Sequence, residues 1–334
     1  MDDVASLQTR ASTLPVGRVL GLRILAHPDL ERVGSLCAPL MDTELSRLAP
    51  TFPDGPLASL HVSRTAVTLM TRADGIVLRG EAHARLAVEG SAVDGEHALS
   101  TDELDAGVVL TLGRAVALWL GHVEPGSRPR LPGFVGVSAL SAALQRRLAQ
   151  LATQDTHVLL HGPSGAGKRT AARVLHSLGP RGMRPLTNGL EDETPYIPEL
   201  CALDAEQQQA LRARLGRGRV LAGCAHERPC ELAASFQDSL PVQALRERPE
   251  DIAPLFAHFV AEALRNVGAL ARFRARDTEP AFVPAALLPR LVRASWPNNA
   301  HQLRAFAEAY VLAQHDQASA DLARWSAAIP GAER

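Results

Sequence analysis

The chain has 334 residues, of which 46% are hydrophobic and 21% are charged. These proportions exclude an intrinsically disordered protein, and the length predicts two or three domains. The formal net charge is −1, with acids and bases interspersed. The chain therefore has no basic face of the kind that binds nucleic acid through its phosphates, and we expect no direct binding to DNA.

Targeting, membrane and metal signals are weak throughout the sequence. The first residues have neither the basic nor the apolar region of a signal peptide. The longest apolar run, from Val108 to Leu120, is interrupted by Arg114 and is too short to span a membrane. The four cysteines contain no CxxC pair, which predicts a reducing cytoplasm and neither a zinc site nor a disulfide framework; they are Cys37, Cys201, Cys224 and Cys230. We expect a cytoplasmic protein without a bound metal.

Residues 17–121 contain short apolar runs of strand length, separated by Gly, Pro and Asp. Several of them alternate between apolar and polar residues, and Asp-Gly pairs at 74–75 and 94–95 are turn signals. Many short strands with little helix predict an all-β sandwich. We expect a polar tail at 1–16 before this sandwich, and a linker rich in Pro and Gly at 122–135 after it.

A glycine-rich segment follows the apolar strand His157–His161. Gly162, Gly165 and Gly167 allow successive backbone N–H groups to face one anion, and Lys168 begins a helix whose first turn also favours an anion. Lys168 is the only lysine of the chain, against 34 arginines. The segment predicts a phosphate-binding P-loop that holds ATP or ADP; its residues are Gly162, Pro163, Ser164, Gly165, Ala166, Gly167, Lys168, Arg169 and Thr170.

The rest of the chain predicts two further units. Strands alternate with helices over 136–244, which favours a parallel sheet with the P-loop at the carboxyl ends of its strands. Residues 245–315 predict helices only, and a tail at 316–334 completes the chain. The expected fold class is therefore multidomain, with an all-β sandwich, an α/β P-loop core and a small α-helical lid; the core and lid together resemble the layout of an AAA+ protein.

The β-rich unit resembles a forkhead-associated (FHA) domain, a sandwich that reads phosphothreonine. The resemblance rests on Leu45-Ser-Arg47, His61-Val-Ser-Arg-Thr-Ala66, Val88-Glu-Gly90 and Leu104-Asp-Ala-Gly107. It implies that Arg47, Ser63 and Arg64 hold a phosphate. The family's histidine is replaced by Ala66, and its Asn-Gly loop by Glu89-Gly90, so the unit is expected either to bind a phosphothreonine protein or to serve only as a docking module.

Three motifs of residues 136–334 resemble the AAA+ domain of sigma-54 activators. They are Gly162-Pro-Ser-Gly-Ala-Gly-Lys168, Leu245-Arg-Glu-Arg-Pro-Glu-Asp-Ile252 and Trp296-Pro-Asn-Asn-Ala-His-Gln-Leu303. That family hydrolyses ATP in a ring and remodels the closed complex of RNA polymerase. The resemblance implies Glu199 as the acid that would orient water if the protein is active.

Other catalytic parts of that family are replaced in this chain. The acid that would support Mg²⁺ aligns with Pro198, and the polar sensor with Ala225. Gln237 stands where an arginine would reach a neighbouring subunit, and His301 replaces the arginine of the lid. Lys168 and Leu245 are only 77 positions apart, and the loop that touches the sigma factor is absent. No helix-turn-helix follows the lid, so we expect no DNA reader.

Three functions remain open on this basis. The first is a nucleotide-binding pseudo-ATPase that regulates or docks a partner, which is either a phosphothreonine protein or a related AAA+ subunit. The second is an active ATPase that activates sigma-54-dependent transcription. The third is an interaction scaffold with a vestigial nucleotide site. Enzyme activity and the use of Mg²⁺ are left undecided, because hydrolysis requires residues that the sequence lacks.

Overall fold

The computed structural model describes residues 17–125, 129–180, 186, 195–225, 230–269, 283–315 and 328–330. The tail expected at 1–16 lies outside these residues. So do most of the tail expected at 316–334 and most of a strand that the sequence predicts at 184–188.

The N-terminal unit consists of antiparallel strands, as predicted. One sheet has the order β2-β1-β12-β11-β8-β9, and a second has the order β10-β7-β6-β3. The first contains β1 (Val19–Ala26), β2 (Leu36–Cys37), β8 (Leu86–Val88), β9 (Ser91–Ala92), β11 (Val108–Leu112) and β12 (Val116–Val123). The second contains β3 (Thr43–Leu45), β6 (Val67–Arg72), β7 (Gly75–Gly80) and β10 (Gly95–Ser100). A hairpin of β4 (Thr51–Phe52) and β5 (Gly55–Pro56) and the short helix α1 (Thr101–Ala106) complete the unit.

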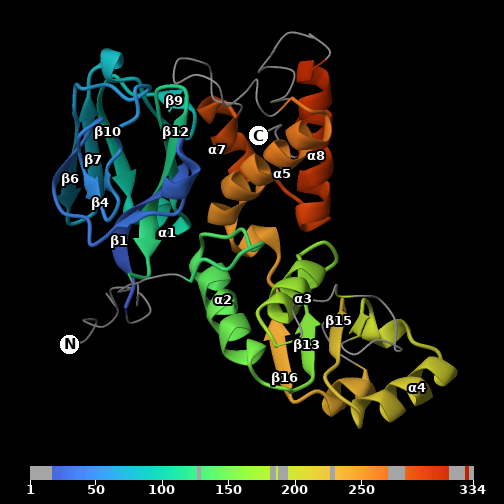
Figure 1. Cartoon of the computed structure of the whole chain (residues 1–334). Coiled ribbons are helices and arrows are strands. Elements are labelled where there is room, and N and C mark those ends of the chain that lie inside the picture. Colours follow the sequence, from blue (N-terminus) through green and yellow to red (C-terminus); the bar gives the residue numbers. More distant parts are fainter. Residues whose placement is uncertain are drawn as a thin grey trace, which may run out of the picture.

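The two sheets enclose one apolar core between them (Figure 1). Leu22 and Ile24 of β1 face it from the first sheet, and Leu69 and Leu78 face it from the second. These residues alternate along their strands, because successive side chains of a strand point to opposite faces of the sheet. This core accounts for the alternating pattern of the sequence.

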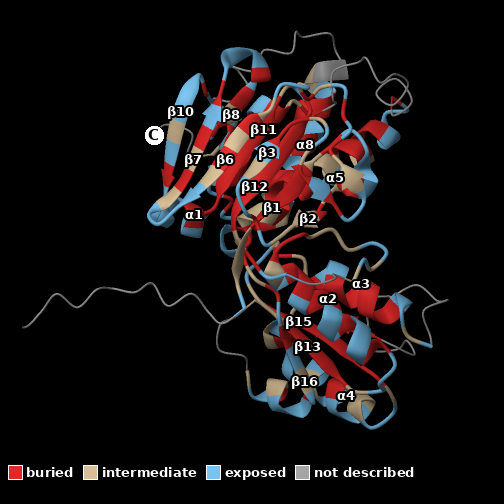
Figure 2. Cartoon of the chain, turned by 90° about the vertical axis from the view of Figure 1, so that its left-hand side faces the viewer, coloured by how far each residue is buried: buried red, intermediate tan, exposed pale blue. Residues whose placement is uncertain are grey.

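The first sheet is also buried on its outer face, as the red strands β1, β11 and β12 of Figure 2 show. Leu118 of β12 belongs to the core of the sandwich, whereas its neighbours Ala117 and Trp119 belong to a second core that the helices of the lid share. Leu25 and Val109 extend this second core onto β1 and β11. A sheet covered on both faces requires almost continuous apolar strands, which explains the run from Val108 to Leu120.

The P-loop unit is built on a parallel sheet with the order β14-β15-β13-β16. Its strands are β13 (Val158–His161), β14 (Tyr196–Ile197), β15 (Leu221–Cys224) and β16 (Asp238–Pro241). The helices are α2 (Ala139–Ala152), α3 (Lys168–Ser177) and α4 (Ala205–Leu215). The parallel sheet predicted from the alternation of strands and helices is confirmed. β13 is one of its two inner strands, between β15 and β16, so the loop after it lies near the middle of the carboxyl edge.

The lid, residues 245–315, is helical where the structure describes it. The 3₁₀ turns η5 (Leu245–Glu247) and η6 (Pro249–Asp251) lead into α5 (Ile252–Asn266), and η7 (Ala285–Leu287) leads into α7 (Leu288–Arg293). The apolar residues Leu303, Phe306, Ala307, Tyr310 and Val311 recur at helical spacing in α8 (Asn299–His315), and all of them are buried except Phe306, which is half-buried. α5 and α7 lie between α8 and the first sheet of the sandwich (Figure 1). None of the helices described is long and apolar enough to cross a membrane.

Candidate functional site

The P-loop connects β13 to α3 in the order that the sequence predicts. Gly162 has φ of 146°, and a Cβ atom at this position would lie 2.1 Å from the carbonyl oxygen of Val242. Gly165 has φ of 72°, and its Cβ atom would lie 2.2 Å from the carbonyl oxygen of Asn298. Both positions therefore require glycine, because the backbone is left-handed and another backbone segment leaves no room for a side chain.

Lys168 is the cation of this loop and is only 9% exposed. Its ammonium group donates hydrogen bonds to the carbonyl oxygens of Gly162 at 2.7 Å and Pro163 at 3.1 Å. Burial lowers the pKa of Lys168, while the Glu199 carboxylate opposes this shift. The ammonium group thus faces the loop itself, where an anion cradled by the loop would meet it. Arg169 and Thr170 are exposed on the first turn of α3.

The motif Trp296-Pro-Asn-Asn299 fixes the lid directly onto the P-loop. Asn299 donates from Nδ2 to the carbonyl oxygen of Ser164 at 2.8 Å, and its Oδ1 accepts the N–H of Leu245 at 2.9 Å. The N–H of Ala300 donates to the carbonyl oxygen of Gly165 at 3.1 Å. The start of α8 is therefore hydrogen-bonded to the phosphate-binding loop, so a nucleotide would be bound between two units that already touch.

The motif Leu245–Ile252 also supports the loop. Arg248 donates from Nη2 to the carbonyl oxygen of Ala166 at 2.6 Å, and its Nη1 lies 3.5 Å from the fully buried Asp251 carboxylate. Asp251 accepts hydrogen bonds from the backbone and hydroxyl of Ser138, from the hydroxyl of Ser141 and from the N–H of Val137. These residues hold the start of α2, the P-loop and the lid in one arrangement.

Glu199 follows the carboxyl end of β14 (Tyr196–Ile197). Both of its carboxylate oxygens accept the N–H of Ala225, at 3.1 and 2.9 Å. Pro198 precedes it and has no oxygen in its side chain, so it adds no ligand for Mg²⁺. The side chain of Ala225 is a methyl group and cannot sense a phosphate. Within the described residues, Glu199 is thus an acid at this edge whose carboxylate is held by a backbone N–H.

Gln237 and His301, which stand where the resemblance predicts arginines, lie in different parts of the structure. Gln237 precedes β16 and accepts the N–H of His157 through Oε1 at 2.8 Å, so it stabilises the edge of its own sheet. His301 is exposed on α8, and its Cβ lies 3.4 Å from the position that a Cβ atom on Gly165 would occupy. Of these two residues, only His301 lies beside the P-loop.

The structure brings two of the three residues proposed for phosphate recognition together in the sandwich. The N–H of Arg47 donates to the carbonyl oxygen of Ser63 at 2.9 Å. The Arg47 guanidinium donates to the carbonyl oxygens of Val62 and Leu60, at 3.0 and 2.9 Å. Ser63 accepts the N–H of Thr65 through its hydroxyl at 3.0 Å, and Arg64 is exposed. Arg47 thus stabilises the loop at residues 60–63, whereas the guanidinium of Arg64 is exposed and accessible to a ligand.

The structure also reveals contacts that the sequence did not predict. Glu89, which occupies the Asn-Gly position of the FHA pattern, has φ of 48° and pairs with Arg293 of the lid. Cys201 and Cys224 lie together beside Glu199, and the N–H of Cys230 donates to the sulfur of Cys201. The spacing Cys224-x-His226-x3-Cys230 resembles half of a metal site, but without a second pair it did not indicate Cys201 or Glu199.

Comparison with known proteins agrees with the resemblance of the P-loop unit to sigma-54 activators. The family described as "Sigma-54 interaction domain" matches residues 135–248. The phosphoglycerate transport system transcriptional regulatory protein PgtA of Salmonella typhimurium is 29% identical over 211 residues, covering 54% of this chain and 48% of its own length. The response regulator protein PilR of Pseudomonas aeruginosa is 27% identical over 269 residues, covering 61% of this chain and 57% of its own. The chain spans about half the length of these curated relatives.

Among solved structures, NtrX from Brucella abortus in complex with ADP superposes with a TM-score of 0.46 at 19% identity, over 62% of this chain and 57% of that one.

Proposed function

We propose that this chain, whose residues 135–248 form a sigma-54 interaction domain, is a nucleotide-binding regulatory protein that binds ATP or ADP without turning it over. One observation carries the proposal: the P-loop from Gly162 to Lys168 is complete between β13 and α3, while the position before Glu199 holds a proline. Backbone donors and one ammonium group are sufficient to bind phosphates. Hydrolysis needs more, since a metal and a positioned water must also be held.

The surroundings of Glu199 support binding over hydrolysis. Its carboxylate is occupied by the N–H of Ala225, and Pro198 contributes no ligand for Mg²⁺. In related phosphoryl-transfer systems, an arginine from a neighbour raises the rate by about 10³ to 10⁵. Gln237, at the position of such an arginine, is bonded to His157 of the same chain. Turnover is therefore expected to be negligible.

Two alternatives have their own supporting observations. An active ATPase that activates sigma-54-dependent transcription is supported by Glu199, the acid that the family uses to orient water. A scaffold with a vestigial nucleotide site is supported by the bonds of Lys168 to Gly162 and Pro163, because they direct the ammonium group to carbonyl oxygens of the loop. PgtA is named as a transcriptional regulatory protein and PilR as a response regulator. These names support a regulatory role whether the chain binds nucleotide, hydrolyses it or does neither.

Phosphate release from ATP with Mg²⁺ tests the proposal against its active alternative. The wild type and Lys168→Ala are expected to release phosphate at the same background rate. Release that requires Mg²⁺ and disappears in Lys168→Ala would overturn the proposal, because an intact P-loop lysine would then be serving catalysis.

For the N-terminal unit, we propose an FHA-like docking role, with a phosphothreonine protein or a related AAA+ subunit as the partner. The exposed Arg64 beside Ser63 favours a phosphorylated ligand, since charge-assisted hydrogen bonds to phosphate are strong. An array of phosphothreonine peptides tests this role. Binding is expected to fall at least tenfold in Arg64→Ala and to persist in Arg72→Ala, another exposed arginine of the sandwich. If no peptide on the array binds, the unit does not recognise phosphothreonine, and any docking to a partner must be independent of phosphate.

A further inference from the structure

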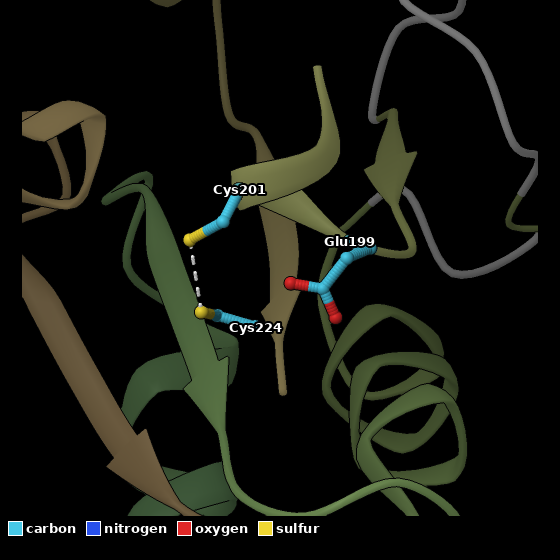
Figure 3. A group of neighbouring side chains, drawn as sticks. All are labelled: Glu199, Cys201 and Cys224. Atoms are coloured by element: carbon cyan, nitrogen blue, oxygen red, sulfur yellow. Dashed lines mark hydrogen bonds between the residues drawn. The ribbon is translucent and has the colours of Figure 1, made fainter. Parts of the chain in front are cut away.

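Three cysteines from separate parts of the P-loop unit meet beside the parallel sheet. Cys201 lies in η3 (Leu200–Ala202), and Cys224 is the last residue of β15. Their sulfur atoms are 3.2 Å apart, and the two side chains point toward each other in Figure 3. The N–H of Cys230 donates to the sulfur of Cys201 at 3.2 Å.

A carboxylate completes the cluster. One oxygen of Glu199 and the sulfurs of Cys201 and Cys224 all lie within 4.8 Å of one another, and Figure 3 shows the carboxylate beside the two sulfurs. The N–H of Ala225 bonds both oxygens of Glu199 and fixes the orientation of the group. Such an outer hydrogen bond is typical of a carboxylate that binds a metal.

We infer that Cys201, Cys224 and Glu199, with Cys230 adjacent to them, form a binding site for Zn²⁺. Thiolates and a carboxylate from one small volume are ligands that Zn²⁺ accepts, with Zn–S bonds of about 2.3 Å and Zn–O bonds of about 2.0–2.2 Å. Two sulfurs on one tetrahedral zinc lie about 3.8 Å apart by that bond length. The sulfurs of Cys201 and Cys224 are 3.2 Å apart. This distance is closer to the sulfur separation at a zinc ion than to the roughly 2.05 Å of a disulfide bond.

The zinc site has a consequence for the edge of the sheet. Zn²⁺ would connect η3 after β14 to the end of β15, and it would bind the carboxylate that an ATPase would use to orient water. Metal binding and nucleotide hydrolysis would then exclude each other at Glu199. The inference does not depend on nucleotide binding, because its ligands are not residues of the P-loop.

Zinc titration of the full, reduced protein against a chromophoric chelator tests the site, with Co²⁺ as a spectroscopic substitute. The wild type is expected to bind one equivalent and to show a thiolate-to-cobalt charge-transfer band. Cys201→Ser and Cys224→Ser are expected to weaken zinc binding at least tenfold, as is Glu199→Gln. Cys37→Ser is the matched control, because Cys37 lies in β2 of the sandwich, and it should bind zinc as the wild type does.

A wild-type protein that binds no zinc in this competition would overturn the inference, as would a disulfide between Cys201 and Cys224 that forms in air and is unaffected by zinc. Binding that survives in Cys201→Ser and Cys224→Ser would also overturn it. If these variants do not fold, the rise of Tm on adding zinc to the wild type and to Cys37→Ser decides the question, since a ligand of the folded state must stabilise it. An unchanged Tm in both would contradict the site.

Discussion

Arg293, the last residue of α7, forms a two-point ion pair with Glu89 in the sandwich. Nη2 and Nε of Arg293 lie 2.6 and 3.2 Å from the two carboxylate oxygens, and Nη2 also donates to the carbonyl oxygen of Gly107. The guanidinium lies 5.8 Å from the centre of the Trp119 ring. The same Glu89 carboxylate accepts the N–H of Val109 at 2.7 Å. Arg293 of the lid thus contacts Glu89, Gly107 and Trp119 of the sandwich.

Arg293→Ala is expected to destabilise the protein by about 1 kcal/mol, since a partly exposed ion pair with a cation–π contact contributes about that much. The effect should appear as a lower midpoint of urea unfolding. Arg290→Ala is the matched control, because Arg290 is an exposed residue of the same helix. Equal midpoints for both variants would show that the pair does not hold the lid on the sandwich.

Gly107 is expected to be essential for the position of Trp119. A Cβ atom on Gly107 would lie 1.8 Å from the Trp119 ring, so Gly107→Ala must displace the ring from the core shared with the lid. Gly90→Ala is the control, since Gly90 also has positive φ, at 86°, but its Cβ atom would meet nothing within 4 Å. The cost of Gly107→Ala should exceed that of Gly90→Ala by about 1–3 kcal/mol, the usual cost of overpacking. A difference near zero would contradict the packing described.

The sequence predicted the two sheets of the sandwich, because the side chains of most strands alternate between a core and solvent. It did not predict the contact between sandwich and lid. The sequence feature that indicates this contact is the run from Val108 to Leu120, because its apolar residues are too continuous for strands with one solvent-exposed face. β12 carries Leu118 toward one core and Trp119 toward the other. The run indicates strands and is too short for a membrane segment, but the burial of its second face depends on a lid that starts more than 120 positions later.

Asp251 is expected to be among the most sensitive residues of the P-loop unit. It is fully buried, and Asp251→Ala removes four hydrogen bonds and leaves the Arg248 charge buried without its acid. Breaking a buried pair in this way costs about 3–5 kcal/mol. Glu262→Ala, which removes an exposed pair with Arg304, should cost about 1 kcal/mol or less. Denaturant unfolding of both variants gives the comparison, and a similar loss in each would rule out the role assigned to Asp251.

Acid should destabilise the sandwich through His27. This residue is 8% exposed, its Nδ1 accepts the N–H of Asp29 at 3.0 Å, and its Nε2 lies 2.9 Å from the carbonyl oxygen of Leu57. Burial lowers its pKa in the folded state below the unfolded value near 6.5, although the carbonyl oxygens of Leu57 and Asp29 beside the ring oppose the shift. The unfolded state therefore binds the proton more readily, and stability should decrease as the pH falls below about 6.5.

The variant His27→Gln isolates this effect. It is expected to be less stable at pH 7 and to lose less stability than the wild type between pH 7 and pH 5. Thermal unfolding measured across that range checks the slope. A variant whose stability falls as steeply as that of the wild type would contradict the assignment to His27.

The P-loop was predictable residue by residue, because its glycines and lysine follow one another along the chain. The contacts that surround it were not, since they join Ser164, Ala166 and Gly165 to residues about 80 to 135 positions away. The two motifs of the lid were identified by resemblance, yet their role in holding the loop appears only in three dimensions. The cysteine cluster had only a weak sequence signal, because Cys224 and Cys230 are close along the chain whereas Cys201 and Glu199 come from a separate segment.

Calorimetric titration with ATP and ADP, each with and without Mg²⁺, tests the central claim most directly. The wild type is expected to bind both nucleotides with affinities that change little on adding Mg²⁺, because Pro198 removes part of the support for the metal. Lys168→Ala should weaken binding at least tenfold, since a hydrogen bond to a charged group contributes about 1.5–3 kcal/mol, while Arg212→Ala on the exposed face of α4 should bind as the wild type does. The absence of binding at millimolar nucleotide, or binding unaffected by Lys168→Ala, would contradict the account.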